Sequence, residues 1–341
     1  MKFVFSSLHL LTMGVFLAVP PLVHANARQV SVEDAPGASQ PDGPLAKARQ
    51  MLGRDKLDDA ESATREFLKT DPTSGEGHYL LAYILFRQAQ AMARATAPAR
   101  YASPSDPTGK PWAGKARASL AEYKLAATYR NPSAFDLKGL ALDYVCLRDY
   151  GDADKSLTLA VKWNPQDAQG WYYLGRTKYN EKRFKEAIQA FQQCLVLDPP
   201  NADAEDNLGL SYAALGRADV AAAAYHRAID WQESKPEKVS GPLLNLGSLL
   251  LQENRVEEAI PYLRRAVEIS PNEAEIHEKL GKALLQANQL RKAETELQRA
   301  VELAPESARL HYNLGRVYQK EGLAGKAKEQ LDQCAVQASW P

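Results

Sequence analysis

This chain of 341 residues has few cysteines, few histidines and no surplus of either charge. Its three cysteines, Cys146, Cys194 and Cys334, are an odd number and lie far apart, which argues against a disulfide framework. Lys plus Arg and Asp plus Glu each number 42, so net charge gives no sign of binding to nucleic acid or to an anionic membrane.

Long apolar runs are also missing, apart from one near the N-terminus. Phe3–Val19 is largely apolar, follows Lys2, and precedes a stretch of small residues that ends at Ala27. The run is shorter than the roughly 20 residues that a membrane span needs, and no basic stop-transfer cluster follows it. We therefore expect residues 1–27 to be a secretory signal, and the mature chain to lack an integral membrane span. An uncleaved anchor is the alternative.

Motifs for catalysis or cofactor binding are scarce, and two partial matches fail. Gly109–Ala116 fits G-x4-G-K, but Ala116 stands where a phosphate loop carries Ser or Thr, and no strand precedes it. His277 begins like a zinc-protease motif, yet Gly281 stands where the second histidine is required. We expect no cofactor, no metal site and no enzymatic activity.

The N-terminal third is irregular. Residues 28–44 contain Pro, Gly, Ser and Asp without an apolar period, which predicts a flexible tether. Residues 45–133 have a weak helical period and are expected to form two degenerate helical units. The second unit is too long by about 26 residues, and the excess falls at about residues 95–112, a predicted loop with four prolines. This insertion is either a lid or partner contact, or a tolerated surface loop.

What the chain does have is a period of 34 residues, by which Gly175 recurs as Gly209 and Gly247 recurs as Gly281. Within one period, small and apolar residues follow helical spacing in two short segments, which predicts a helical hairpin. One such hairpin cannot bury its apolar stripe alone, so neighbouring hairpins must stack. In residues 168–201 the two segments carry Trp171, Leu174 and Gly175, then Ala187, Phe191 and Cys194, before Pro199 closes the unit.

The pattern W-x2-L-G-x2-Y, then A-x3-F-x2-A, then P, at this period, resembles the tetratricopeptide repeat. The resemblance implies an all-α fold, a right-handed α/α superhelical solenoid of antiparallel helix hairpins. Lys178 departs from the pattern at its Tyr position, and His277 and His311 depart at its Trp position. On this reading six clear repeats follow the two degenerate units, and they span residues 134–167, 168–201, 202–239, 240–273, 274–307 and 308–341.

The resemblance also implies that first helices line a concave groove that binds a protein or peptide. The second, fifth, sixth, ninth and twelfth residues of each repeat are expected to face it. Asparagines at the sixth position suit the backbone of an extended peptide, because an amide both donates and accepts, or they are simple helix-surface residues. The candidate partner-binding residues are Lys138, Tyr172, Tyr173, Arg176, Tyr179, Asp203, Asp206, Asn207, Asn245, Glu278, Lys282, Tyr312, Asn313 and Arg316.

The function that we expect is that of an exported scaffold or adaptor, periplasmic or secreted, that binds a peptide or protein of unknown identity in this groove. An alternative is an assembly factor of cell-envelope, secretion, pilus or polysaccharide-export machinery, which the export signal together with the long solenoid favours. Lesser alternatives are an enzyme and a self-associating structural protein. Self-association, giving a homo-oligomer, would use Val336 and Trp340 of the C-terminal repeat.

Overall fold

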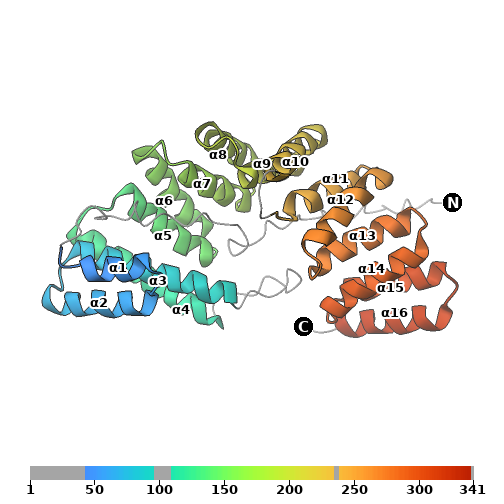
Figure 1. Ribbon diagram of the computed structural model, residues 1–341, viewed down its shortest axis with the longest axis horizontal. Coiled ribbons are helices and arrows are strands. Elements are labelled where there is room, and N and C mark those ends of the chain that lie inside the picture. The colour runs from blue at the N-terminus through green and yellow to red at the C-terminus, as the bar shows by residue number, and fades with distance from the viewer. Residues whose placement is uncertain (1–42, 96–108, 234–237, 339–341) are drawn as a thin grey trace, which may run out of the picture.

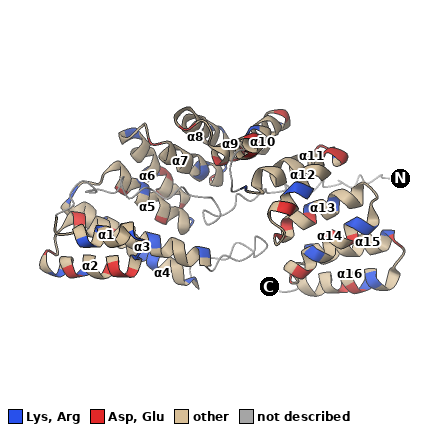
Figure 2. Ribbon diagram, in the orientation of Figure 1, with Lys and Arg blue, Asp and Glu red and all other residues tan. Residues whose placement is uncertain are grey.

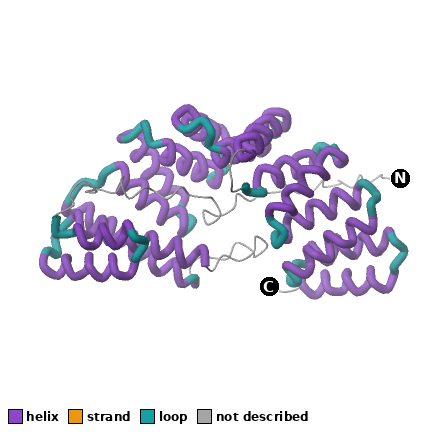
Figure 3. Tube along the Cα trace, viewed as in Figure 1, coloured by secondary structure: helices purple, strands orange, loops and turns teal. Residues whose placement is uncertain are grey.

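The computed structural model describes residues 43–95, 109–233 and 238–338. These ranges form sixteen helices and no strand, arranged as an arch of helical hairpins (Figures 1 and 3). The all-α solenoid predicted from the repeat pattern is confirmed. The predicted signal segment and Trp340 lie outside the described residues.

Each hairpin pairs an odd-numbered first helix with the even-numbered second helix that follows it. Four hairpins form the N-terminal half: α1 Ala46–Gly53 with α2 Leu57–Thr70, α3 Gly75–Ala95 with α4 Pro111–Tyr129, α5 Ala134–Cys146 with α6 Tyr150–Trp163, and α7 Ala168–Asn180 with α8 Phe184–Leu197. Four more complete the array: α9 Ala202–Ala214 with α10 Ala218–Glu233, α11 Gly241–Gln252 with α12 Val256–Ile269, α13 Ala274–Gln286 with α14 Leu290–Leu303, and α15 Ala308–Lys320 with α16 Ala324–Ala338.

The array curves because first helices lie closer together than second helices. From α3 to α15 each first helix contacts the first helix of the next hairpin, and within the described ranges no pair of second helices is in comparable contact. Second helices instead pack against the first helix that follows them. The first helices therefore line the inner, concave side of the arch, and the second helices form its outer side.

Tight packing within a hairpin depends on a glycine at the eighth position of the repeat. A Cβ atom built on Gly175 would lie 2.6 Å from the ring of Phe191 on α8, and one on Gly209 would lie 2.6 Å from the ring of Tyr225 on α10. In the two repeats that follow, a leucine side chain takes the place of the ring. The large side chain of the second helix thus rests directly on the backbone of the first.

Except between α3 and α4, whose connection lies outside the described ranges, the turn inside each hairpin uses one residue with a left-handed backbone, a frequent ending for a helix. In the third and sixth clear repeats this residue is glycine, Gly216 and Gly322, with φ of 72° and 75°. Arg148 and Lys182 adopt the same conformation in the first two clear repeats, with φ of 64° and 61°. The turn geometry is therefore kept even where a side chain makes it less favourable.

The residue at the Trp position ties consecutive hairpins together. The indole Nε1–H of Trp171 donates to the carbonyl oxygen of Pro165 at 2.9 Å. His277 and His311 replace the indole by placing Nε2 at 2.9 and 2.8 Å from the equivalent proline carbonyls. Both histidines are buried. Their expected place in the packed repeat is confirmed, since a ring N–H is the feature that imidazole shares with indole.

The insertion predicted at residues 95–112 is shorter than expected at both ends. Ala95 is the last residue of α3, and Pro111 opens α4, so Trp112 is helical and its prediction as loop is wrong. Proline suits the first turn of a helix because its missing N–H would have no partner there. Lys115 of the failed phosphate-loop match lies on α4, 2.9 Å from a carboxylate oxygen of Glu61. Residues 96–108 lie outside the described ranges.

A buried carboxyl group joins the second hairpin to the third. Asp143 of α5 has no exposed surface, and Oδ2 contacts the hydroxyl of Ser119 on α4. The same hydroxyl lies 2.7 Å from the carbonyl oxygen of Ala82 on α3. One hydroxyl proton cannot serve two acceptors, so a protonated carboxyl satisfies this arrangement best. Burial raises the pKa of Asp143 well above its usual range, although its hydrogen bond with Ser119 opposes the shift.

We expect Gly175→Ala to destabilise the array by about 1–3 kcal/mol, because the new methyl group overlaps the ring of Phe191. Chemical denaturation measures the loss. Gly114→Ala is the control, since nothing lies within 4 Å of a Cβ there, and a small stabilisation of up to about 1 kcal/mol is expected. Equal stability of wild type and Gly175→Ala would contradict this account of the packing.

Asp143 should make stability fall as pH rises. Its folded-state pKa is raised, so its contribution is fully present below the ordinary value of 3.8 and is lost as pH rises through the folded-state value. Denaturation of the wild type and of Asp143→Asn at several pH values between about 4 and 9 measures the difference. The variant should be the more stable protein, relative to wild type, at the alkaline end. A constant difference across the range would show that the carboxyl does not titrate there.

Candidate functional site: the first-helix face

The candidate site is the inner side of the array, here called the first-helix face. It comprises the second, fifth, sixth, ninth and twelfth positions of α5, α7, α9, α11, α13 and α15, and it contains all fourteen predicted partner-binding residues. Charges of both signs are interspersed along the array (Figure 2). Partner binding by these fourteen residues stays a prediction, and the structure shows what holds each part of the face in place.

The N-terminal part of the face is aromatic. Tyr172 and Tyr173 of α7 lie with ring centroids 5.5 Å apart, and the guanidinium of Arg176 lies 5.8 Å from the ring of Tyr172. Tyr179 completes the α7 set with its ring edge against Phe184. All four predicted α7 residues are buried at side-chain level, and burial raises the pKa of Tyr173 and of Tyr179 to about 12. This part of the face is thus a packed aromatic surface with few charged side chains.

Lys138, on α5, serves the array itself. Its side chain is 7% exposed, and Nζ lies 2.7 Å from a carboxylate oxygen of Asp167. Asp167 also caps α7, because its side chain accepts the backbone N–H of Gly170. The lysine therefore joins the first clear repeat to the start of the second.

The middle of the face is acidic. Asp206 of α9 accepts the side-chain amide of Asn245 on α11, with Nδ2 2.9 and 3.1 Å from its two oxygens. Asn207 donates its amide to the carbonyl oxygen of Asp203 at 2.7 Å and lies 3.5 Å from the hydroxyl of Tyr172. The amides at the sixth position therefore bridge adjacent first helices, and each has a defined orientation.

In the C-terminal part of the face, an asparagine at the sixth position again bridges two adjacent first helices. Asn313 of α15 donates to Glu278 of α13 at 2.9 Å, and the second carboxylate oxygen of Glu278 lies 2.9 Å from Arg309. Glu278 is 1% exposed. Tyr312 and Arg316, in contrast, are exposed, with the guanidinium 6.0 Å from the ring. These two are the predicted residues that stand out furthest from the packed surface.

One residue of the face was missed by sequence reasoning. Lys279 occupies the sixth position of its repeat, where three other repeats carry asparagine, and it lies beside Lys282. Burial lowers the pKa of Lys279, while Glu275 and Glu278 oppose the shift. Counting the sixth position in every repeat, rather than following asparagine alone, would have found it.

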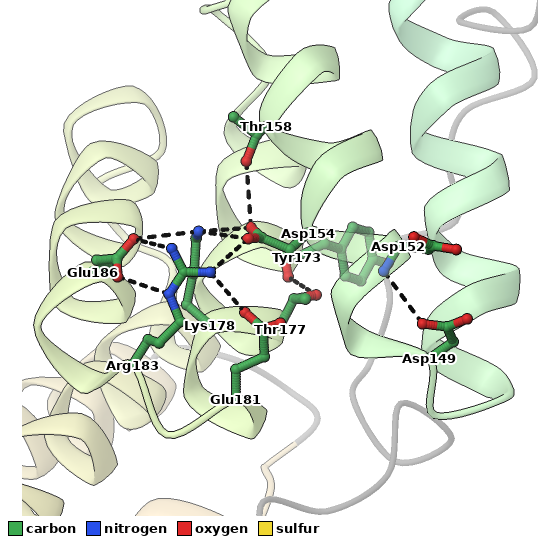
Figure 4. A network of polar contacts seen from close by, with 10 residues as sticks. All are labelled: Asp149, Asp152, Asp154, Thr158, Tyr173, Thr177, Lys178, Glu181, Arg183 and Glu186. Carbon is green, nitrogen blue, oxygen red and sulfur yellow. Dashed lines mark hydrogen bonds and ion pairs between the residues drawn. The ribbon is translucent and has the colours of Figure 1, made fainter.

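Another charged cluster lies at the junction of α6, α7 and α8 (Figure 4). Lys178, at the position where the repeat pattern has Tyr, places Nζ 2.7 Å from Asp154 of the preceding hairpin and 3.3 Å from Glu186. Arg183 also reaches Asp154, at 2.6 Å. The ammonium thus replaces the aromatic contact between repeats by an ion pair, and the cluster serves the architecture rather than the first-helix face.

Burial also disfavours thiol chemistry at Cys146. Cys146 lies at the end of α5, and burial raises the pKa of its thiol to about 12, with Asp143 adding to the shift. A thiol with this pKa is protonated and inert at neutral pH. Among the described residues no cluster of three or more His, Cys, Asp or Glu side chains could hold a metal ion, and no helix is long and apolar enough to cross a membrane.

Comparison with known protein families shows which repeat family the chain matches. Profiles described as tetratricopeptide repeat match residues 168–201, 207–274, 250–311 and 308–335. Together with the hairpin geometry, these matches show that the chain belongs to the tetratricopeptide repeat family. It is a repeat scaffold of the kind that binds proteins or peptides.

Individual similar proteins match over part of the chain. A peroxisomal targeting signal receptor of Komagataella phaffii is 29% identical over 131 residues, 37% of this chain and 22% of the receptor. The cytochrome c-type biogenesis protein CycH of Pseudomonas aeruginosa is 30% identical over 117 residues, 34% of this chain and 28% of CycH. The chain thus spans about a quarter of the length of these relatives. The solved structure of PilW, a type IV pilus biogenesis factor, covers 62% of this chain and 94% of its own, with a TM-score of 0.54 and 22% identity, which shows a shared fold.

We expect Lys178→Met to destabilise the array by about 1–3 kcal/mol, because the carboxylate of Asp154, 15% exposed, loses one of its two cations and keeps only Arg183. Urea denaturation of Lys178→Met, Asp154→Asn and the double variant gives the coupling between the two groups. The double variant should cost less than the sum of the single changes. Strict additivity would show that the ion pair contributes nothing specific.

Proposed function

We propose that this protein is an exported adaptor that binds an extended peptide, or an extended segment of a protein, along its first-helix face. The observation that supports the proposal is the bridging of adjacent first helices by polar side chains, Asn207 to Tyr172, Asn245 to Asp206 and Asn313 to Glu278. These bridges fix donors and acceptors along one continuous concave surface before any partner binds. A preorganised surface loses less side-chain entropy when it binds.

An extended segment suits this surface better than a folded domain does. An extended chain presents a backbone N–H and C=O at every residue, and amide side chains such as Asn245 can pair with both. The arch follows a line of first helices, so successive residues of the segment would meet successive repeats. Binding is proposed in place of catalysis because carboxylates such as Glu278 are neutralised by neighbours instead of converging on a reacting group.

Export is proposed from residues 1–27, in which a charged start, an apolar run and small residues follow one another as in a secretory signal. The mature protein would then act in the periplasm or outside the cell. A role as an assembly factor of envelope machinery is the second candidate. It is favoured by the similarity to CycH, whose name describes cytochrome c biogenesis, over a third of this chain.

The test is affinity purification from envelope extract with two matched pairs of substitutions in the chain that begins at Arg28. Tyr312→Ala with Arg316→Ala changes two exposed side chains of the first-helix face. Trp163→Ala with Arg264→Ala changes an exposed aromatic and an exposed arginine on second helices. The first pair should reduce partner recovery by about tenfold or more, and the second should leave it unchanged. Circular dichroism checks that both variants are folded.

If the Trp163 and Arg264 variant loses the partner while the Tyr312 and Arg316 variant keeps it, the binding surface lies on the outer side of the arch and the proposal is wrong. Retention by both variants would also contradict the proposal.

Mass determination of the mature N-terminus in an expressing cell tests export separately: cleavage after Ala25 or Ala27 is expected, and an intact Met1 would contradict it.

A further inference from the structure

The ring of His277 has a hydrogen-bond partner at each of its two nitrogens. Nε2 lies 2.9 Å from the carbonyl oxygen of Pro271, in the connection between α12 and α13, and Nδ1 lies 2.7 Å from Oε2 of Glu296 on α14. The histidine is 5% exposed, and the side chain of Glu296 is 23% exposed. One imidazole ring thus joins three consecutive segments of the array.

Both groups that face this ring are hydrogen-bond acceptors. A carbonyl oxygen and an ionised carboxylate have no proton to donate, whereas a neutral imidazole has a single N–H. A neutral His277 therefore satisfies one acceptor and turns a lone pair toward the other. The imidazolium has an N–H on each nitrogen, satisfies both acceptors and pairs its charge with Glu296. His78 on α3 repeats the arrangement, with the carbonyl oxygen of Pro72 at 3.0 Å and Glu122 at 2.6 Å.

The junction that follows His277 differs in one group. Nε2 of His311 lies 2.8 Å from the carbonyl oxygen of Pro305, but Nδ1 lies 2.8 Å from Oε1 of Gln330 on α16. A side-chain amide can rotate to present its NH2 group, so Gln330 can donate to a neutral ring. The carboxylate of Glu296 cannot do so while it is ionised.

Arg299 of α14 is the other charged group near this ring. It contacts Asn272, the residue after Pro271, at 3.0 Å, and its charge is paired with Glu302 at 3.1 Å. Burial lowers the pKa of His277, and Arg299 acts in the same direction. The two hydrogen bonds and the charge of the facing carboxylate outweigh them, so the pKa is raised.

We propose that His277 and Glu296 form a pH-sensitive joint, in which a proton on the imidazole attaches α13 to the preceding connection and to α14, and its loss weakens both attachments. The next residue, Glu278, pairs with Asn313 and Arg309. The joint therefore steadies the helix that carries the C-terminal part of the first-helix face. It acts on the packing of the array, whatever partner the face binds.

The contribution of this joint to stability should be lost as pH rises. Because the folded-state pKa of His277 is raised, the contribution is fully present below the ordinary histidine value of 6.5 and disappears as pH rises through the folded-state value. A carboxylate facing a lone pair is then left in place of an ion pair.

Urea denaturation at about pH 5 and about pH 8 compares the wild type with Glu296→Gln, in the chain that begins at Arg28. The variant keeps the shape of the side chain and supplies the amide that Gln330 provides at His311. Between the two pH values, the unfolding constant of the wild type should rise about threefold to tenfold more than that of the variant, as expected for one charge-assisted hydrogen bond partly offset by desolvation. Asp143 is present in both proteins, so its contribution cancels.

The reverse substitution tests the same rule at the neighbouring junction. Gln330→Glu places a carboxylate against Nδ1 of His311 and should add a pH dependence of similar size. Glu329→Gln, a change at an exposed carboxylate on α16, is the matched control and should leave the pH dependence of the wild type unchanged.

Nitrogen-15 NMR of the histidine-labelled wild type reads the proton directly and does not depend on how well any variant folds. Both ring nitrogens of His277 should be protonated at pH 6.5 and become neutral only above it. A ring with one N–H at that pH would overturn the joint. Equal pH dependence of the wild type and Glu296→Gln, or no gain in Gln330→Glu, would overturn it as well.

Discussion

The close approach of the two helices in each hairpin is the contact on which the rest of the array depends. At Gly175 and Gly209 the absence of a side chain lets an aromatic ring of the second helix rest on the backbone of the first. Each hairpin is therefore thin, with its apolar surfaces facing the neighbouring hairpins, and stacking of the hairpins buries a continuous core. In the first clear repeat Ala141 takes the place of the glycine opposite Leu157, and both are fully buried. Gly247 and Gly281 also lie opposite leucines but leave no room for a Cβ atom, so a methyl group is accommodated at this position in the first clear repeat and not in those two.

The curvature that creates a binding surface follows from the same packing. Adjacent first helices from α3 to α15 touch one another, whereas no pair of second helices in the described part of the chain is in comparable contact, so side chains of adjacent first helices come within hydrogen-bonding distance. Asn313 and Glu278 lie on successive first helices, 35 residues apart in sequence, and form one buried contact. The polar groups of the face thus support one another across repeats, and the array presents them in fixed positions.

How far the sequence predicts this structure depends on whether a feature repeats. The helices, their pairing and the position of His277 can be predicted from the spacing of residues in the repeat, because the same spacing recurs in every repeat. The partners of single residues do not follow. Nothing in the pattern shows that Lys178 would pair with Asp154 of the preceding hairpin, or that Ser119 and Asp143 would meet from α4 and α5. Such contacts depend on three-dimensional placement of side chains that occur once.

The candidate site shows the same division. The position of each residue within its repeat assigns all fourteen predicted residues to the first-helix face. Position alone, however, does not distinguish buried residues such as Glu278 from exposed ones such as Tyr312. It also gives no sign that Tyr225, which stands on a second helix where another repeat has Phe191, would bury a hydroxyl that has no hydrogen-bond partner among the described residues.

The most direct measurement places a photocrosslinking amino acid at one exposed aromatic position on each side of the arch. Tyr312 on the first-helix face is 48% exposed and Trp163 on α6 is 49% exposed, so the two positions are equally accessible. Irradiation in cells that express the protein should give a crosslinked partner from position 312 and none from position 163. A partner captured only from position 163 would contradict the central claim that the concave side is where this scaffold binds.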